Sequence, residues 1–356
     1  MTRDERGFSR RDLLRAGTVA ATGLLWAGLP EFGGRADAQG QKPLAIDVHA
    51  HLFPEAYLDL VQRYGKTDTG TQRDRKAGIA PGEMDARFAL MDAAGVDMQI
   101  LSVSPQVPHF ENKANAVTAA KMANDMLADA AHQWPKRFRF FAALPMPHVD
   151  EALKEMERAF GLGAVGVGLS TVILDHSLAD AAFMPVYEEM NRRATVLFLH
   201  PAGNAIFSKL IADYHLTWMI GAPAEDSVAA LHLIQQGIPT KCPNLKIINS
   251  HLGGALPVLL KRLDSITTWE YPQMPEKPSI ALRRMYYDTV DYGDVPALHA
   301  SIAAFGVDKM VLGSDFPYET GDLYTLSASY IREAGLKPEE TAAILGGNAA
   351  KMLRLS

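Results

Sequence analysis

Short apolar runs rich in β-branched residues alternate along this chain with longer stretches of helical periodicity. Eight runs have the length and composition of buried strands: residues 44–51, 97–104, 139–146, 164–171, 195–201, 246–254, 285–290 and 310–317. Apolar residues recur at helical spacing over 82–95, 115–134, 180–193 and 226–237. Eight strands that alternate with helices predict an α/β fold, in which one parallel sheet closes into a single (β/α)8 barrel of the TIM type.

Nothing divides residues 39–356 into two domains, because this region has no internal repeat and no low-complexity linker. With 48% hydrophobic and 21% charged residues, the 356-residue chain has a globular composition. We therefore expect residues 39–356 to form one barrel domain. The proline-containing segment 267–279 is its most irregular insertion, and we expect a loop or a subunit contact there. A homodimer is the expected assembly.

Charge and cysteine content exclude some partners. The net charge is −6 and no basic block follows the N-terminus, so nucleic acid is not an expected partner. Cys242 is the only cysteine, so no disulfide can form within the chain. This fits a reducing compartment, and it equally fits a protein that folds before export. No stretch of the mature chain approaches the length of a membrane span.

The N-terminus has the features of a cleavable export signal. Arg10 and Arg11 precede a mildly apolar run over residues 16–30, and Ala36 and Ala38 form a small-x-small cleavage pattern. This pattern predicts a twin-arginine signal peptide over residues 1–38 and a periplasmic protein. The alternative is an uncleaved amphipathic arm, and the protein would be cytoplasmic if the signal were not used.

Five residues suited to metal or proton chemistry fall at the ends of predicted strands. His49 and His51 lie one residue apart in the first, so a regular strand would point both to the same face. By themselves they could be a core histidine and a loop histidine. However, His200 ends the fifth strand, His251 the sixth and Asp315 the eighth. The carboxyl ends of barrel strands converge on one mouth, where active sites lie.

This set of residue types suits a divalent metal ion. His49, His51, His200 and Asp315 offer three imidazoles and one carboxylate, which suits a zinc-like ion with a position left for water or substrate. His251 is then free to act as a general base or acid beside the ion. We assign catalysis to His251 and to Asp315, which also serves as a ligand. We expect zinc.

The sequence resembles the amidohydrolase superfamily, and within it the branch of non-oxidative decarboxylases similar to aminocarboxymuconate semialdehyde decarboxylase. The resemblance covers nearly all of residues 44–354 and rests on these motifs: DVHAHLFP, RFFAALPM, LFLHPAG, GAPAED, INSHLGGALP, VLGSDFPYE and GNAAKMLRL. It implies that His49, His51, His200 and Asp315 bind the metal, and that His251 is the catalytic base or acid. Binuclear relatives carry a carboxylated lysine on the fourth strand, but residues 164–171 contain no lysine, so one metal ion is expected.

Candidate substrate-binding residues follow the first, second and fifth strands. The resemblance implies arginines that grip substrate carboxylates, and Arg73 and Arg75 are the candidates, with solvated loop charges as the alternative. His109 and Phe110 are expected to line the pocket. Trp218 either packs on a planar substrate or belongs to the core.

Two further residues have open roles. Glu225, at a predicted helix start, is either a helix cap or a carboxylate that orients a ligand. Arg87 is expected to pack or form a salt bridge.

These observations favour a carbon–carbon lyase that releases CO₂ from a small aromatic or dienoic carboxylate. The alternative is a hydrolase of a lactone, ester or amide that uses the same metal site. A third alternative, an inactive barrel kept as a binding protein, is disfavoured because every ligand-type residue is present.

Overall fold

The computed structural model describes residues 44–204, 206 and 208–355, and the export signal predicted for residues 1–38 lies outside them. Eight parallel strands form the central sheet, in the order β1-β2-β3-β4-β7-β8-β9-β10. The strands are β1 Ile46–His51, β2 Met98–Ser102, β3 Phe138–Ala143, β4 Gly166–Ser170, β7 Val196–His200, β8 Lys246–Asn249, β9 Tyr286–Asp288 and β10 Met310–Val311. Seven lie within their predicted segments and β3 begins one residue before its segment, so the strand prediction is confirmed.

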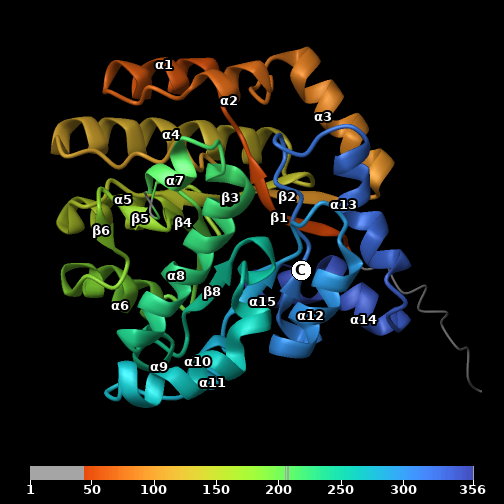
Figure 1. The fold of residues 1–356 in the computed structure, drawn as a ribbon. Helices are drawn as coiled ribbons and strands as arrows, with labels where there is room; N and C mark the ends of the chain where they lie inside the picture. Colours follow the sequence, from red (N-terminus) through yellow and green to blue (C-terminus); the bar gives the residue numbers. More distant parts are fainter. Residues whose placement is uncertain (1–43, 205, 207, 356) are drawn as a thin grey trace, which may run out of the picture. The chain divides into compact units, whose positions relative to one another are not determined.

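The last strand returns to the first, so the sheet forms a nearly closed barrel (Figure 1). The Val48 amide donates to the Leu312 carbonyl, and the Asp315 amide donates to the His49 carbonyl, both at 2.8 Å. An isolated parallel bridge joins Ala50 to Phe316. This is the architecture expected of a TIM-type barrel.

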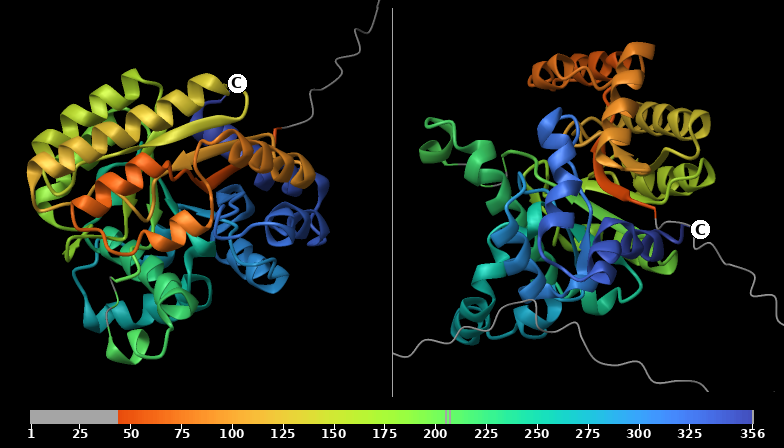
Figure 2. Two further views of the ribbon diagram at one scale, coloured as in Figure 1. Left: turned by 90° about the horizontal axis from the view of Figure 1, so that it is seen from above. Right: turned by 90° about the vertical axis from the view of Figure 1, so that its right-hand side faces the viewer.

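Helices surround the barrel, as the views in Figure 2 show. The α-helices are α1 Glu55–Arg63, α2 Gly70–Asp74, α3 Pro81–Ala94, α4 Lys113–Gln133, α5 Val149–Gly161, α6 Met184–Arg192, α7 Lys209–Ala212, α8 Ala222–Gln235, α9 Ile238–Lys241, α10 Leu256–Glu270, α11 Pro278–Leu282, α12 Val295–Phe305, α13 Asp322–Glu333, α14 Pro338–Ala342 and α15 Asn348–Leu353. Smaller elements are the hairpin β5 Val172–Ile173 and β6 His176–Ser177, the 3₁₀ turns η1 Ala181–Phe183, η3 His251–Gly253 and η4 Val307–Lys309, and the π-turns η2 Thr217–Gly221 and η5 Ala343–Gly347. In this described part of the chain, no helix combines the length and apolar character needed to cross a bilayer.

The helix predictions hold with two adjustments. The predicted helix 180–193 is divided into η1 and α6, because Pro185 opens a new helix at its N-terminal end. The predicted irregular segment 267–279 is shorter than expected. Helix α10 continues to Glu270 and α11 begins at Pro278, so only residues 271–277 lie outside helices.

Glycines on β4 accommodate large rings inside the barrel. The ring of Phe141 on β3 stacks on Phe198 of β7, with centroids 5.2 Å apart. A Cβ atom at Gly166 would lie 2.8 Å from the Phe141 ring and 2.7 Å from the Val196 carbonyl oxygen. The glycines in residues 164–168 therefore leave space inside the barrel, and aromatic rings from the neighbouring strands fill that space.

A β-bulge in β1 places the first histidines. The pairing of β1 with β2 runs from Asp47–Gln99 to Ala50–Leu101, so one extra residue of β1 lies opposite β2. Asp47 binds the Gln99 side chain, which contacts Tyr324 on α13 and so lies on the outer surface of the sheet. An unbroken strand would put His49 on the same surface. The bulge turns His49 into the barrel together with His51.

Candidate active site

Four side chains converge at the carboxyl ends of β1, β7 and β10. Ligand-type atoms of His49, His51, His200 and Asp315 lie within 4.8 Å of one another. The Asp315 Oδ1 atom lies 3.1 Å from His49 Nε2, 3.0 Å from His51 Nε2 and 3.8 Å from His200 Nε2. The three histidines are buried and Asp315 is 9% exposed. The predicted four-residue set is therefore assembled as one site.

Hydrogen bonds on the far side of each ring orient the three imidazoles. His49 Nδ1 lies 2.8 Å from Asp288 Oδ2, and His51 Nδ1 lies 2.8 Å from Ser102 Oγ. His200 Nδ1 lies 2.9 Å from the Pro201 carbonyl oxygen. Each Nδ1 faces an oxygen that accepts its proton, so each Nε2 keeps its lone pair toward the centre.

The donor set fits a divalent metal ion. His49 Nε2 and His200 Nε2 are buried and have no hydrogen-bond partner among the described residues. Buried polar atoms without partners are rare in proteins, and a bound ion satisfies them. Three neutral imidazoles with one carboxylate form a donor set used by zinc and other transition-metal ions. His49, His51, His200 and Asp315 are thus a single metal-binding site.

A fifth residue, His251, faces the site without belonging to the cluster. His251 Nδ1 lies 2.8 Å from Asp226 Oδ2, and His251 Nε2 lies 3.9 Å from Asp315 Oδ2. Burial lowers the pKa of His251, but the Asp226 and Asp315 carboxylates outweigh it and hold that pKa well above its usual value. Burial raises the pKa of Asp226 to about 6. His251 can therefore hold a proton at the edge of the metal site.

Two of these functional residues have a strained backbone. His251 and Asp315 both have φ near 53°, in the left-handed region that residues other than glycine rarely adopt. The conformation costs about 1–3 kcal/mol per residue and persists where the surrounding structure determines it. The Asp288 carboxylate accepts a hydrogen bond from the His251 amide at 2.9 Å, which holds this turn. The strain aims both side chains at the same point.

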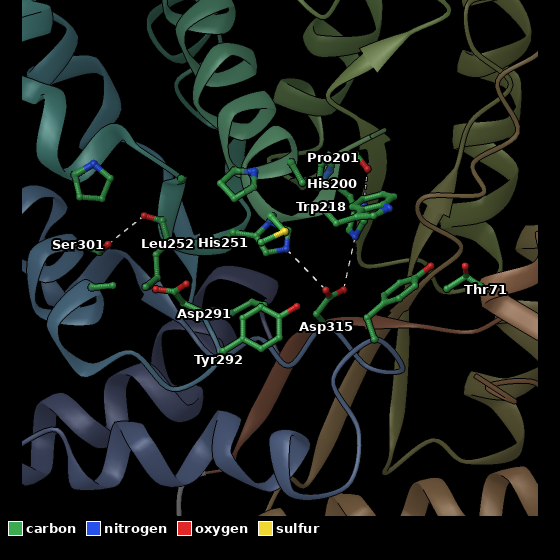
Figure 3. A pocket seen from close by; sticks show the side chains of 18 of the residues that line it. Thr71, His200, Pro201, Trp218, His251, Leu252, Asp291, Tyr292, Ser301 and Asp315 are labelled. Atoms are coloured by element: carbon green, nitrogen blue, oxygen red, sulfur yellow. Dashed lines mark hydrogen bonds and ion pairs between the residues drawn. The ribbon is translucent and has the colours of Figure 1, made fainter. Parts of the chain in front are cut away.

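A cavity of about 560 Å³ opens beside the metal site. His200, His251 and Asp315 form its floor, and Trp218 and Tyr292 stand on two of its walls (Figure 3). This volume lies within the range of small-molecule sites, ~300–1,000 Å³. A planar substrate can thus reach the metal site and His251 together.

Two of the five predicted substrate-binding residues line the cavity and three do not. Arg75 and Trp218 line the cavity. Arg75 donates to the Tyr318 carbonyl oxygen at 3.3 Å and is otherwise exposed. Trp218 is 56% exposed, so it is not a core residue. Their contact with substrate stays a prediction.

The other three candidates do not line this cavity. Arg73 is held by ion pairs with Glu55 and with Asp59, the latter at 2.9 Å, so α1 neutralises its charge. Phe110 packs edge-on against Tyr64, with centroids 5.7 Å apart. His109 is buried, and burial lowers its pKa to about 3, so it carries no charge toward a carboxylate. None of the three lines this cavity, so the structure does not support the expected contact with substrate, which stays a prediction.

Glu225 supports the chain that follows His200. Its Oε2 atom accepts hydrogen bonds from the amides of Ala202, at 2.8 Å, and Gly203, at 3.0 Å. It also accepts one from the Thr171 hydroxyl at 2.9 Å. Two roles were considered for Glu225, a helix cap and a carboxylate that orients a metal-binding residue. These hydrogen bonds correspond to the second role, because they hold the segment that directly follows His200.

Arg87 is buried and structural. It donates to the His51 carbonyl oxygen at 2.6 Å and to Gln99 Oε1 at 2.8 Å, and it lies over the Phe316 ring. It therefore packs against the end of β1, as expected, and forms no salt bridge within the described residues.

Sequence reasoning missed the carboxylates behind the histidines. Asp226 is the fifth residue of α8 and directly follows Glu225, the acidic residue of the first turn. Asp288 ends β9, the seventh strand of the barrel, whose carboxyl end also points to the mouth. The strand-end rule that identified His200 and Asp315 could have identified Asp288 as well.

The sequence profile of the Amidohydrolase family matches residues 46–355. This protein belongs to the amidohydrolase family. It is 26% identical over 337 residues to 2-amino-3-carboxymuconate-6-semialdehyde decarboxylase of Dictyostelium discoideum, which covers 88% of this chain and 92% of the relative. It is 31% identical over 317 residues to 6-methylsalicylic acid decarboxylase of Penicillium expansum, which covers 86% and 94%.

This amidohydrolase also resembles a solved decarboxylase structure. Dihydroxybenzoic acid decarboxylase from Polaromonas sp., with bound manganese and the inhibitor 2-nitroresorcinol, matches with a TM-score of 0.75 and 27% identity. The match covers 88% of this chain and 97% of that one. The family expected from the resemblance is confirmed, and the nearly closed barrel of eight parallel strands is consistent with the expected TIM-type fold.

Proposed function

We propose that this amidohydrolase is a metal-dependent, non-oxidative decarboxylase of an aromatic carboxylate with a hydroxyl group beside the carboxyl. The decisive observation is the position of His251, whose Nδ1 is bound to buried Asp226 while its Nε2 faces the metal site. Relatives named as decarboxylases of semialdehyde, dihydroxybenzoic and methylsalicylic acids support the assignment. The dienoic substrate class is the second choice, because two of these three names are of hydroxybenzoic acids.

His251 supplies the proton that the reaction consumes. Its Nε2 transfers a proton to the ring carbon that bears the carboxylate, and Asp226 stabilises the imidazolium before the transfer. The bond between this carbon and the carboxylate carbon then breaks, its electron pair returns to the ring, and CO₂ leaves. Solvent reprotonates His251 for the next turnover.

The metal site complements this proton transfer. A divalent ion held by His49, His51, His200 and Asp315 would fix the carboxylate and hydroxyl oxygens of the substrate and offset their negative charge. Zinc is the ion proposed from the donor set, and manganese is the ion in the Polaromonas structure. Metal analysis therefore has to quantify both elements.

A hydrolase is the alternative function of the same residues. His251 would then take a proton from a water molecule that attacks a lactone, ester or amide carbonyl. The two reactions are distinguished by incubating metal-loaded protein with a panel of 2-hydroxybenzoates and lactones. CO₂ release from the benzoates without acid release from the lactones supports the decarboxylase, and the reverse supports the hydrolase.

We propose export by the twin-arginine route, with cleavage after Ala38 and a periplasmic location, on the basis of Arg10, Arg11 and residues 36–38.

We also propose a homodimer. Leu210, Tyr214 and Ile220 are each more than half exposed on one short segment, and such apolar clusters mark interfaces. Leu210→Glu with Tyr214→Glu is expected to convert a dimer into a monomer in sedimentation velocity, and a monomeric wild-type protein would exclude the dimer.

A further inference from the structure

The catalytic cavity continues past His251, on the side away from His200 and Trp218. Figure 3 shows Leu252, Asp291 and Ser301 on one side of His251, with His200 and Trp218 on the other. The part beyond His251 is here called the side pocket. Its apolar wall consists of Leu252, Pro257, Val258, Val290, Ala297 and Ala300.

Small residues on one face of α12 keep the side pocket open. Ala297, Ala300 and Ser301 are spaced by three and four positions, so they share the face of α12 that borders the cavity. The inner end is closed by Leu252 and Val290, which are 3% and 1% exposed. The side pocket is therefore an apolar extension of the catalytic cavity that is closed at its inner end and open to solvent at Val258, which is 77% exposed.

Polar groups of the side pocket select against a second anion. The Ser301 hydroxyl already donates to the Leu252 carbonyl oxygen at 3.1 Å. Asp291 is the one charged side chain among the described residues that line this part of the cavity. Its carboxylate repels a second carboxylate on the substrate, and the one cation among the described residues that border this part of the cavity, protonated His251, is already paired with Asp226.

On the basis of the proposed decarboxylase function, we infer that the native substrate carries an uncharged apolar substituent of several carbons, which lies in the side pocket. The substrate class is thus an alkyl- or acyl-substituted 2-hydroxybenzoate, and not a benzenedicarboxylate. Apolar burial is worth about 0.8 kcal/mol for each methylene, which equals roughly a fourfold gain in affinity.

The test is a series of 2-hydroxybenzoates with hydrogen, methyl, ethyl, propyl or butyl at position 4 or 6. In at least one series, kcat/KM is expected to rise roughly fourfold per added carbon until the pocket is full. Ala300→Leu should bring the butyl-to-hydrogen ratio of kcat/KM close to one. Ala303→Leu, at an exposed position on the same helix, is the matched control and should keep the wild-type ratio. Flat series at both positions, or a ratio that Ala300→Leu leaves unchanged, would overturn the inference.

A binding measurement separates this inference from the proposed reaction. Decarboxylation of either series leaves a 3-alkylphenol, and calorimetry can compare phenol with 3-butylphenol on metal-loaded protein. Tighter binding of 3-butylphenol that Ala300→Leu removes supports the side pocket even if no benzoate releases CO₂. Equal binding of the two phenols contradicts it even if salicylate is decarboxylated. Asp291→Asn is expected to raise kcat/KM for a hydroxybenzenedicarboxylate relative to salicylate, and no change would remove the charge argument.

Discussion

His251 Nδ1 lies 2.8 Å from the Oδ2 atom of Asp226, a carboxylate that is fully buried. This pair is built from two elements, the turn after β8 and the N-terminal half of α8. A buried carboxylate behind an imidazole fixes its orientation and favours its protonated form. His251 is also surplus to the four metal-binding residues. The pair thus supports the proposal that His251 is the proton donor of the site.

Replacement of His251 by alanine is expected to lower kcat roughly 100- to 10,000-fold, the usual contribution of a positioned proton-transfer group. The metal content should not change, because His251 lies outside the cluster of ligand atoms. Activity and metal content are measured on the same preparation. The exposed His132→Ala variant is the control. Loss of the metal in His251→Ala would make His251 a ligand.

Asp226→Asn tests the role of the carboxylate through the pH profile. Asp226 raises the pKa of His251, so its removal should lower that pKa. Since the reaction uses protonated His251, activity is lost as pH rises through this pKa. The descending limb of the pH profile should therefore move to lower pH in the variant. A uniform loss of rate with an unshifted limb would indicate a purely structural carboxylate.

The metal site is tested by elemental analysis. We expect one divalent ion per chain in the wild-type protein, and loss of that ion when His49 and His51 are both replaced by alanine. These two imidazoles approach Asp315 Oδ1 most closely, at 3.1 and 3.0 Å. A stoichiometry near two, or tight binding that survives the double replacement, would contradict a single four-residue site.

Gly166→Ala is expected to lower the melting temperature, because the added methyl group meets the Phe141 ring and the Val196 carbonyl. Overpacking of this kind costs about 1–3 kcal/mol. Gly161→Ala is the matched control, since a Cβ atom there meets no heavy atom within 4 Å among the described residues. Thermal unfolding followed by circular dichroism compares the two. Equal melting temperatures would mean that the barrel interior adapts to the methyl group.

The ligand set could be predicted from the sequence because each member ends a strand. In a parallel barrel this position alone brings residues as distant as His49 and Asp315 to one mouth. The β1 bulge could not be predicted, because it depends on pairing between β1 and β2. His49 and His51 nevertheless share a face, as their spacing predicts, because both rings reach the Asp315 carboxylate.

The substrate-binding residues were harder to predict, because the contacts of a loop side chain depend on which neighbouring elements pack against the loop. Arg73 and Arg75 are two positions apart, yet Arg73 is neutralised by α1 while Arg75 reaches the cavity. Only the packing of α1 against this loop separates them. Asp226 was equally hidden, because its partner His251 is 25 positions away and neither residue alone indicates the pair.

Export is tested in the precursor by replacing Arg10 and Arg11 with lysine. The twin-arginine pathway reads this pair, so the variant should stay in the cytoplasm with residues 1–38 uncleaved. Cell fractionation and intact mass of the recovered protein give the result. Replacement of Arg3 and Arg6, which precede the pair, is the control. Unchanged periplasmic recovery of the lysine variant would contradict the signal.

If His251 delivers a proton to the ring carbon as CO₂ leaves, both events can be followed in one reaction. The experiment is turnover of carboxyl-¹³C 2-hydroxybenzoates by metal-loaded enzyme in D₂O, followed by NMR. We expect one ¹³CO₂ for each product molecule and one deuterium at the carbon that carried the carboxylate. His251→Ala should lose both signals together. Lactone opening with acid release, and no ¹³CO₂ from any benzoate, would contradict the decarboxylase and leave the hydrolase in its place.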